Sequence, residues 1–334
     1  MTGAIVFGLL VIVGTVILLV KRIETRLVLI GAGFLMTIGA FCFAKMGVDN
    51  MGTPMTAFNA FSTRMTAGSF IQTICSTLGF AMVLQYTYCD KHLIHSLAKI
   101  LSKVRPLLIP GVVIATFCVN IALVSAAGCS AAVGVIMIPL LISQGVHPAV
   151  AASAVMRGTF GSNLSPGNPN NAMIGELANM SILEVIKAHT FAMILCLIVA
   201  AGWLSFYAKI KGENKGFHSE EYEPVDTGFK INPILAILPL VPIAMLILFT
   251  FPAVQAKISW AAAFKVPHAM ILGSFLCMVF TRSNPQEVTR KFFDGMGKAY
   301  GDVLGIIIAA AVFVAGMESL GMVEAFINMM KNSN

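Results

Sequence analysis

Long apolar runs separated by short polar segments recur along the whole chain. The runs are close to the roughly 20 residues that a helix needs to cross the hydrocarbon core of a membrane. Backbone N–H and C=O groups find no water in lipid, so such runs must form helices. We therefore predict an all-α polytopic membrane protein. The predicted spans are 3–20, 27–44, 66–88, 107–124, 131–143, 147–162, 188–208, 232–251, 267–281 and 300–317.

Basic residues gather in four of the segments between these spans, namely 21–26, 89–106, 209–230 and 282–299. Loops rich in Lys and Arg stay on the cytoplasmic side, so we place all four there. The first apolar run has no charged residue before it, unlike a cleavable signal peptide. We expect this span to be retained in the cell inner membrane with the N-terminus outside.

This topology constrains the segment 107–143. Between the cytoplasmic segments 89–106 and 209–230 lie 107–143, 147–180 and the span 188–208. If the last two each cross the membrane, 107–143 must enter and leave on the same side, as a re-entrant helical hairpin. Its middle, residues 125–130, is small and polar, as expected of non-helical backbone that lines a polar cavity.

A second polar interruption follows at residues 157–176. Gly161, Pro166, Gly167 and Pro169 cannot all lie in one intact helix, so we predict a broken helix. A break exposes carbonyls that suit a sodium ion and helix N-terminal amides that suit a carboxylate. The alternative interpretation is an ordinary extramembrane loop, because Ser, Asn, Pro and Gly also form turns.

The two interruptions supply the candidate site. Arg157 is an arginine within a span and offers a bidentate donor for a carboxylate, although a structural ion pair or an interfacial position would also explain it. We place a candidate sodium site near Ser125 and Asn163. The candidate substrate-binding residues are Ser125, Ser130, Arg157, Ser162, Asn163, Ser165, Asn168 and Asn170.

Composition excludes several other classes of protein. The chain is 57% hydrophobic and 11% charged, with mean hydropathy +0.87, which leaves too little polar surface for a soluble domain. Its net charge of +7 resides in loops and indicates topology control, not nucleic-acid binding. The seven cysteines form no CxxC pair, and no nucleophile–base or metal-ligand arrangement is evident. We therefore expect no enzyme and no cofactor beyond Na⁺ or H⁺ as a coupling ion.

A weak internal repeat has an offset of 233 residues. It pairs Gly68 with Gly301 and Phe80 with Phe313, and the two spans concerned would run in opposite directions, as in an inverted-repeat transporter. The counterpart of 125–130 would fall at about 358–363, beyond Asn334, so we expect an incomplete second repeat. Residues 89–104 predict an amphipathic helix whose apolar face includes Leu93, Ile94 and Ile100. The predicted domains are scaffold helices with this amphipathic helix at 1–106, half of a transport domain at 107–208, a cytoplasmic linker at 209–231 and the start of the second repeat at 232–334.

Several stretches resemble the DcuC-type anaerobic C4-dicarboxylate carriers of the ion transporter superfamily. They are 124–134, 162–171 with 178–187, 237–242, and 292–297 with 313–321. The resemblance covers essentially the whole chain. It implies succinate, fumarate or malate as substrate, moved by exchange or with a proton or sodium ion, and a scaffold that forms a homodimer. By position it assigns the 125–130 tip and the 162–171 break to the substrate site.

Two alternative functions remain open on the sequence. One is a carrier for another organic anion or an amino acid in the same superfamily. The other is an inactive or partner-dependent fragment of a split transporter.

The hairpin interpretation predicts the sidedness of two segments. Single cysteines placed in 45–65 and in 89–106 should react with a membrane-impermeant maleimide from opposite faces of the membrane. Labelling of both segments from the same face would contradict the re-entrant hairpin.

Overall fold

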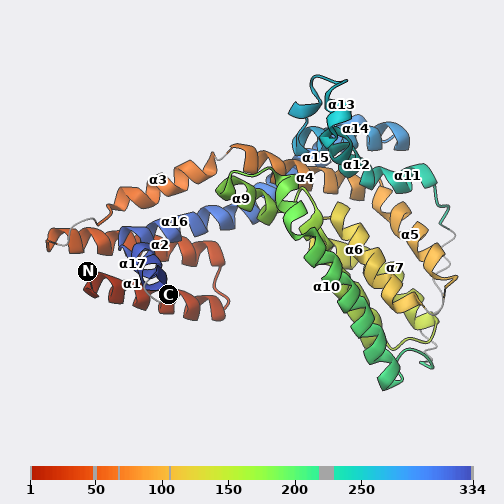
Figure 1. The fold of residues 1–334 in the computed structure, drawn as a ribbon, viewed down its shortest axis with the longest axis horizontal. Coiled ribbons are helices and arrows are strands. Elements are labelled where there is room, and N and C mark those ends of the chain that lie inside the picture. The colour runs from red at the N-terminus through yellow and green to blue at the C-terminus, as the bar shows by residue number, and fades with distance from the viewer. Residues whose placement is uncertain (1, 48–50, 67, 105–106, 218–228, 332–334) are drawn as a thin grey trace. The chain divides into compact units, whose positions relative to one another are not determined.

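The computed structural model describes residues 2–47, 51–66, 68–104, 107–217 and 229–331, and every regular element among them is a helix. Six helices or continuous helical runs in this part are long and apolar enough to cross a membrane. The prediction of an all-α polytopic membrane protein is therefore confirmed. The chain divides into two compact units, one of residues 1–71 with 300–334 and one of residues 72–299 (Figure 1).

The first unit combines helices from both ends of the chain. Helix α16 lies along α2, and α17 follows it (Figure 1). A small core of Ala4, Met36, Ala40, Leu320 and Met322 joins them. The helices are α1 (Thr2–Val20), α2 (Thr25–Lys45), α3 (Pro54–Met65), α16 (Gly305–Ser319) and α17 (Met322–Lys331).

Glycines bring α2 and α16 into backbone contact. A Cβ added at Gly33 would lie 2.5 Å from the carbonyl O of Val312, and one added at Gly316 would lie 2.8 Å from the carbonyl O of Gly33. Small residues at such a contact let two membrane helices pack through their backbones.

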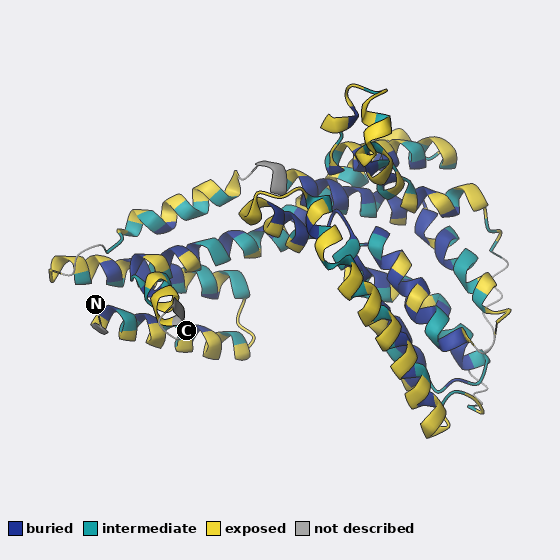
Figure 2. Ribbon diagram, in the orientation of Figure 1, coloured by how far each residue is buried: buried dark blue, intermediate teal, exposed yellow. Residues whose placement is uncertain are grey.

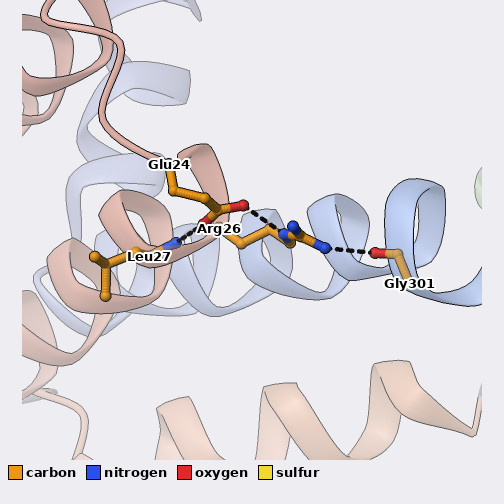
Figure 3. A network of polar contacts seen from close by, with 4 residues as sticks. All are labelled: Glu24, Arg26, Leu27 and Gly301. Carbon is orange, nitrogen blue, oxygen red and sulfur yellow. Dashed lines mark hydrogen bonds and ion pairs between the residues drawn. The ribbon is translucent and has the colours of Figure 1, made fainter.

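A short π-helix, η5 (Ala299–Leu304), precedes α16, and an arginine satisfies one of its carbonyls. The Arg26 guanidinium donates from Nη1 to the carbonyl O of Gly301 at 2.8 Å (Figure 3). It also bonds the carboxylate of Glu24, which accepts from the Leu27 N–H and so caps α2. The hydrogen bond from Arg26 lowers the pKa of the Glu24 carboxyl. The start of α2 is thereby fixed to η5.

The second unit, residues 72–299, has one large apolar core. Buried residues concentrate on α6, α7 and α8, whereas α10 is exposed along most of its length (Figure 2). The helices are α4 (Gly68–Tyr86), α5 (Cys89–Leu101), α6 (Leu108–Ala122), α7 (Ala126–Ser143), α8 (Pro148–Gly158), η2 (Gly161–Leu164), α9 (Pro169–Ala178), α10 (Ile182–Lys211), α11 (Pro233–Ile237), η3 (Leu238–Leu240), α12 (Val241–Thr250), α13 (Pro252–Gln255), η4 (Ala261–Ala263), α14 (Val266–Thr281) and α15 (Pro285–Lys298).

The exposed side of α10 is apolar, with Phe191, Ile198 and Trp203 each more than half exposed. A continuous apolar surface of this kind on a 30-residue helix suits contact with lipid.

The repeat is visible in the bounds of the helices. Adding 233 to the bounds of α3 gives 287–298, against 285–298 for α15. The same shift moves α4 to 301–319, which η5 and α16 together occupy, and moves the start of α5 to 322, where α17 begins. The order of a short helix, a longer apolar helix and an amphipathic helix therefore occurs twice. The opposite orientation of the two copies in a membrane stays a prediction.

Two details differ from the sequence prediction. The segments 45–65 and 282–299, expected as loops, contain the helices α3 and α15, each of which begins at a proline in its first turn. The amphipathic helix expected at 89–104 is present as α5, with Leu93 and Ile94 buried. Ile100, assigned to its apolar face, is instead 63% exposed. The predicted division into scaffold and transport domains stays a prediction.

Gly31 and Gly33 offer a matched test of the α2–α16 contact. Gly33→Ala forces a Cβ against backbone atoms, and we expect it to lower stability by about 1–3 kcal/mol. Gly31→Ala meets nothing within 4 Å, so the better helix propensity of alanine should leave stability unchanged or raised. Thermal unfolding of the detergent-purified protein measures both variants. Equal melting temperatures would contradict the close packing.

Candidate functional site

The predicted helix break is confirmed. Helix α8 ends at Gly158, the short helix η2 occupies 161–164, and α9 starts at Pro169. Two glycines allow the interrupted segment to lie against α6. A Cβ at Gly158 would lie 2.4 Å from Cβ of Thr116, and one at Gly161 would lie 2.1 Å from the carbonyl O of Phe117. The break is therefore packed inside the second unit and is not an extended surface loop.

Side-chain amides satisfy the backbone carbonyls that the break exposes. Asn168 Nδ2 donates to the carbonyl O of Ser162 at 3.0 Å. Asn171 Nδ2 donates to the carbonyl O of Asn163 at 2.7 Å and to that of Ser165 at 3.1 Å. The Oδ1 atom of Asn168 accepts from the Asn170 N–H at 2.8 Å and caps α9. The segment thus carries its own replacement for the helical hydrogen bonds that the prolines remove.

A buried asparagine joins the hairpin to the break. Asn120, near the end of α6, accepts from the Ser162 N–H at 2.7 Å and donates to the carbonyl O of Leu123 at 2.8 Å. It is fully buried. Our sequence interpretation missed Asn120, although a lone asparagine within an apolar membrane helix is itself a signal of a structural or functional role.

The predicted hairpin is present as α6 and α7, linked by residues 123–125. The two helices lie side by side, since the Cys129 thiol donates to the carbonyl O of Thr116 at 3.8 Å. Ser125 is the exposed N-cap of α7 and accepts from the Gly128 N–H at 3.1 Å. Ser130 is half-buried and donates to the carbonyl O of Ala127. The α6 end of the tip contacts the break directly. Whether the hairpin is re-entrant stays a prediction.

The remaining predicted residues divide by burial. Ser162, Ser165 and Asn168 are buried, and Asn163 is half-buried. Asn170 is exposed in the first turn of α9.

Arg157 is exposed in the last turn of α8, where a cation favours the negative end of the helix dipole. Its exposure fits the interfacial alternative better than a buried anion clamp. A role for Arg157 in binding stays a prediction, as does the sodium site near Ser125 and Asn163.

Two side chains of α10 reach the break and were also missed. His189 Nε2 lies 3.0 Å from the carbonyl O of Asn163, and Met193 Sδ lies 3.9 Å from Asn163 Nδ2. These contacts surround Asn163, whose Oδ1 also accepts from Asn168 Nδ2 at 3.4 Å. The carboxamide is thereby oriented with its oxygen towards α9 and its Nδ2 towards a thioether, which is a weak acceptor.

Two of the donors at the break that remain available to a ligand lie on Asn163 and Ser162. One is Asn163 Nδ2, because a sulfur at 3.9 Å is a poor partner. The other is the hydroxyl of Ser162, for which the described residues supply no hydrogen bond while both its backbone groups are bonded. A surface groove of about 660 Å³ lies elsewhere, between α10 and the α12–α13 segment, and none of the predicted site residues lines it.

Comparisons with known proteins agree with this architecture. The family described as DcuC, C4-dicarboxylate anaerobic carrier, matches residues 4–333. A putative uncharacterized transporter of Haemophilus influenzae is 49% identical over 140 residues, which is 42% of this chain and 89% of that protein. A second one from the same organism is 34% identical over 178 residues, which is 51% of this chain and 63% of that protein.

The anaerobic C4-dicarboxylate transporter DcuC of Escherichia coli K12 is similar along almost the whole chain. It is 20% identical over 341 residues, covering 97% of this chain and 72% of that protein. The family match spans nearly every residue, and the family is one of carriers, not of enzymes. The chain therefore belongs to the DcuC family of anaerobic C4-dicarboxylate carriers.

Proposed function

We propose that this chain binds C4-dicarboxylates such as succinate, fumarate and malate at the break between α8 and α9 and carries them across the inner membrane. Membership of a C4-dicarboxylate carrier family supports the substrate class. The break supports the location, because it is an amide-rich interruption of the α-helix in the interior of an otherwise apolar helical unit.

The orientation of Asn163 is the observation on which the proposal rests. Its backbone oxygen accepts from two side chains and its Oδ1 from a third, whereas its Nδ2 faces only a sulfur atom. A carboxylate oxygen is a far better acceptor than a thioether, so a bound dicarboxylate would improve this contact. The hydroxyl of the neighbouring Ser162 would donate a second hydrogen bond to the same anion.

Neutral donors suit a carrier for a chemical reason. A buried guanidinium pairs strongly with a carboxylate, and the ion pair is difficult to separate in a low dielectric. Hydroxyl and amide donors give weaker bonds to the anion, so that binding and release can alternate. Because Arg157 is exposed, it would attract the anion towards the site but would not hold the bound anion.

The remaining parts of the proposal follow the family and the charge pattern. Transport would use exchange or a sodium ion or proton as coupling ion, and the N-terminus would lie outside. The scaffold helices would form a homodimer in the bilayer.

Alanine substitutions test the site. We expect Ser162→Ala and Asn163→Ala each to raise the half-saturating succinate concentration about 10-fold or more in proteoliposomes, since each removes a hydrogen bond to a charged ligand. Ser205→Ala is the matched control, because that hydroxyl donates only to the carbonyl O of Ala201 in its own helix. Unchanged uptake in both site variants would show that the substrate binds elsewhere.

Counterflow separates the dicarboxylate from the amino-acid alternative. Proteoliposomes loaded with unlabelled succinate should accumulate labelled succinate, and those loaded with arginine should not accumulate labelled arginine. Accumulation of arginine alone would overturn the dicarboxylate assignment.

A further inference from the structure

The groove between α10 and the α12–α13 segment is separate from the break. Its volume, about 660 Å³, lies within the range of pockets that bind small ligands. Its walls are mainly apolar, with Phe191 and Ile194 on the α10 side and Ile247 and Phe251 on the other. All four of these side chains are exposed in the structure, so the groove is open to whatever surrounds the protein.

The hydroxyl groups in the groove are already bonded within their own helices. Thr190 donates to the carbonyl O of Ile186 at 2.7 Å, and Thr250 donates to that of Leu246 at 2.8 Å. Water in such a groove would find few partners, and an empty groove would lose the dispersion contacts of its walls. An apolar occupant satisfies the walls best.

The predicted spans place both walls at the same surface of the membrane. Lys187 directly precedes the span 188–208, and Phe251 ends the span 232–251, which runs in the opposite direction. Ile194 and Ile247 then lie deeper in the membrane. From Lys187 to Ile194 helix α10 rises about 10 Å, less than the ~15 Å of one leaflet. The groove therefore runs from the level of the lipid headgroups into the acyl chains of a single leaflet.

The charged residue that lines the groove is Lys187, and its side chain is exposed. An ammonium group at the headgroup level attracts an anionic lipid. Glu184, one turn earlier on α10, does not line the groove. Its carboxylate accepts from the N–H and the hydroxyl of Ser181 in the capping box of the helix. A cation at the surface end and apolar walls below it match the two parts of a phospholipid.

A second copy of the chain fits this groove less well. A two-fold interface uses the same patch on both copies. Two copies that met at this groove would bring their Lys187 side chains towards each other, and like charges repel. The same charge favours a lipid phosphate.

We propose that this groove is a binding site for an anionic phospholipid, with one acyl chain between α10 and α12 and the phosphate at Lys187. Phosphatidylglycerol has the required chemistry, because the phosphate is the only charge of its headgroup. Phosphatidylcholine carries its own ammonium group beside the phosphate and gains less from Lys187. The site is independent of the substrate site proposed at the break.

Fluorescence quenching by brominated lipid tests the site in the full chain. Phe191→Trp, in a Trp203→Phe and Trp260→Phe background, places the one tryptophan of the chain in the groove. This reporter protein is reconstituted in phosphatidylcholine nanodiscs that contain an equal mole fraction of dibrominated phosphatidylglycerol or of dibrominated phosphatidylcholine. We expect the groove to prefer phosphatidylglycerol about fivefold, which is the effect of one lysine near an anionic lipid.

Two matched variants of the reporter protein locate the preference. Lys187→Gln should abolish it. Lys209→Gln removes the same charge from the last turn of the same helix and should leave it unchanged. The Trp260→Phe protein, without the other changes, keeps Trp203 on the exposed apolar side of α10 outside the groove, and this tryptophan should show no preference.

Three outcomes would overturn the proposal. They are equal quenching of the groove reporter by both lipids, a preference that survives Lys187→Gln, and an equal preference at Trp203, which would mean general enrichment of anionic lipid around the protein. Native mass spectrometry gives a second measurement that needs no reporter. The unaltered chain should retain bound phosphatidylglycerol that Lys187→Gln loses, and equal retention by both would also contradict the site. None of these measurements depends on transport of succinate, so a failure here leaves the proposed function untouched.

Discussion

Every buried backbone amide and carbonyl needs a hydrogen-bond partner, and in the break between α8 and α9 a regular α-helix does not supply one. Two prolines and two glycines end the helical ladder there, within the interior of the second unit. Asn120, Asn168 and Asn171 supply the missing partners through their carboxamides. The high asparagine content of the segment is thus first a means of holding irregular backbone. Some polar atoms of the break, among them the Ser162 hydroxyl and Asn163 Nδ2, are not used in this way.

Close backbone approach at glycine recurs in both units. In the first unit, Gly33 and Gly316 let α2 and α16 touch through main-chain atoms. In the second, Gly158 and Gly161 do the same for the broken helix against α6. Membrane helices gain little from apolar burial against lipid, so such contacts and interhelical hydrogen bonds provide the specificity of packing. The close contacts at Gly158 and Gly161 therefore position the break against α6 independently of the side-chain hydrogen bonds. This arrangement fixes the geometry of the amides that remain for a ligand.

The predictable part of this structure is the part that local chemistry determines. The six helical runs that are long and apolar enough to cross a membrane follow from hydropathy. The break follows from Gly161, Pro166 and Pro169, whose backbone restrictions act without reference to the fold. Hydropathy did not predict the helices α3 and α15, because they are short and amphipathic and contain no long apolar run. The partners of the break could not be predicted, since Asn120 and His189 lie 42 and 26 residues away from the residues that they contact. Such pairings arise only when α6 and α10 pack on either side of the segment.

Asn163 both stabilises the break through its oxygen atoms and carries the Nδ2 donor that we propose for the substrate. Its main-chain oxygen is bound by α9 through Asn171 and by α10 through His189, and its side-chain oxygen is bound by Asn168. A ligand that pairs with the remaining Nδ2 therefore acts on a residue that three other side chains already hold. The position of this donor is therefore set by α9 and α10 together, because the two oxygen atoms of Asn163 bond to side chains from both of these helices.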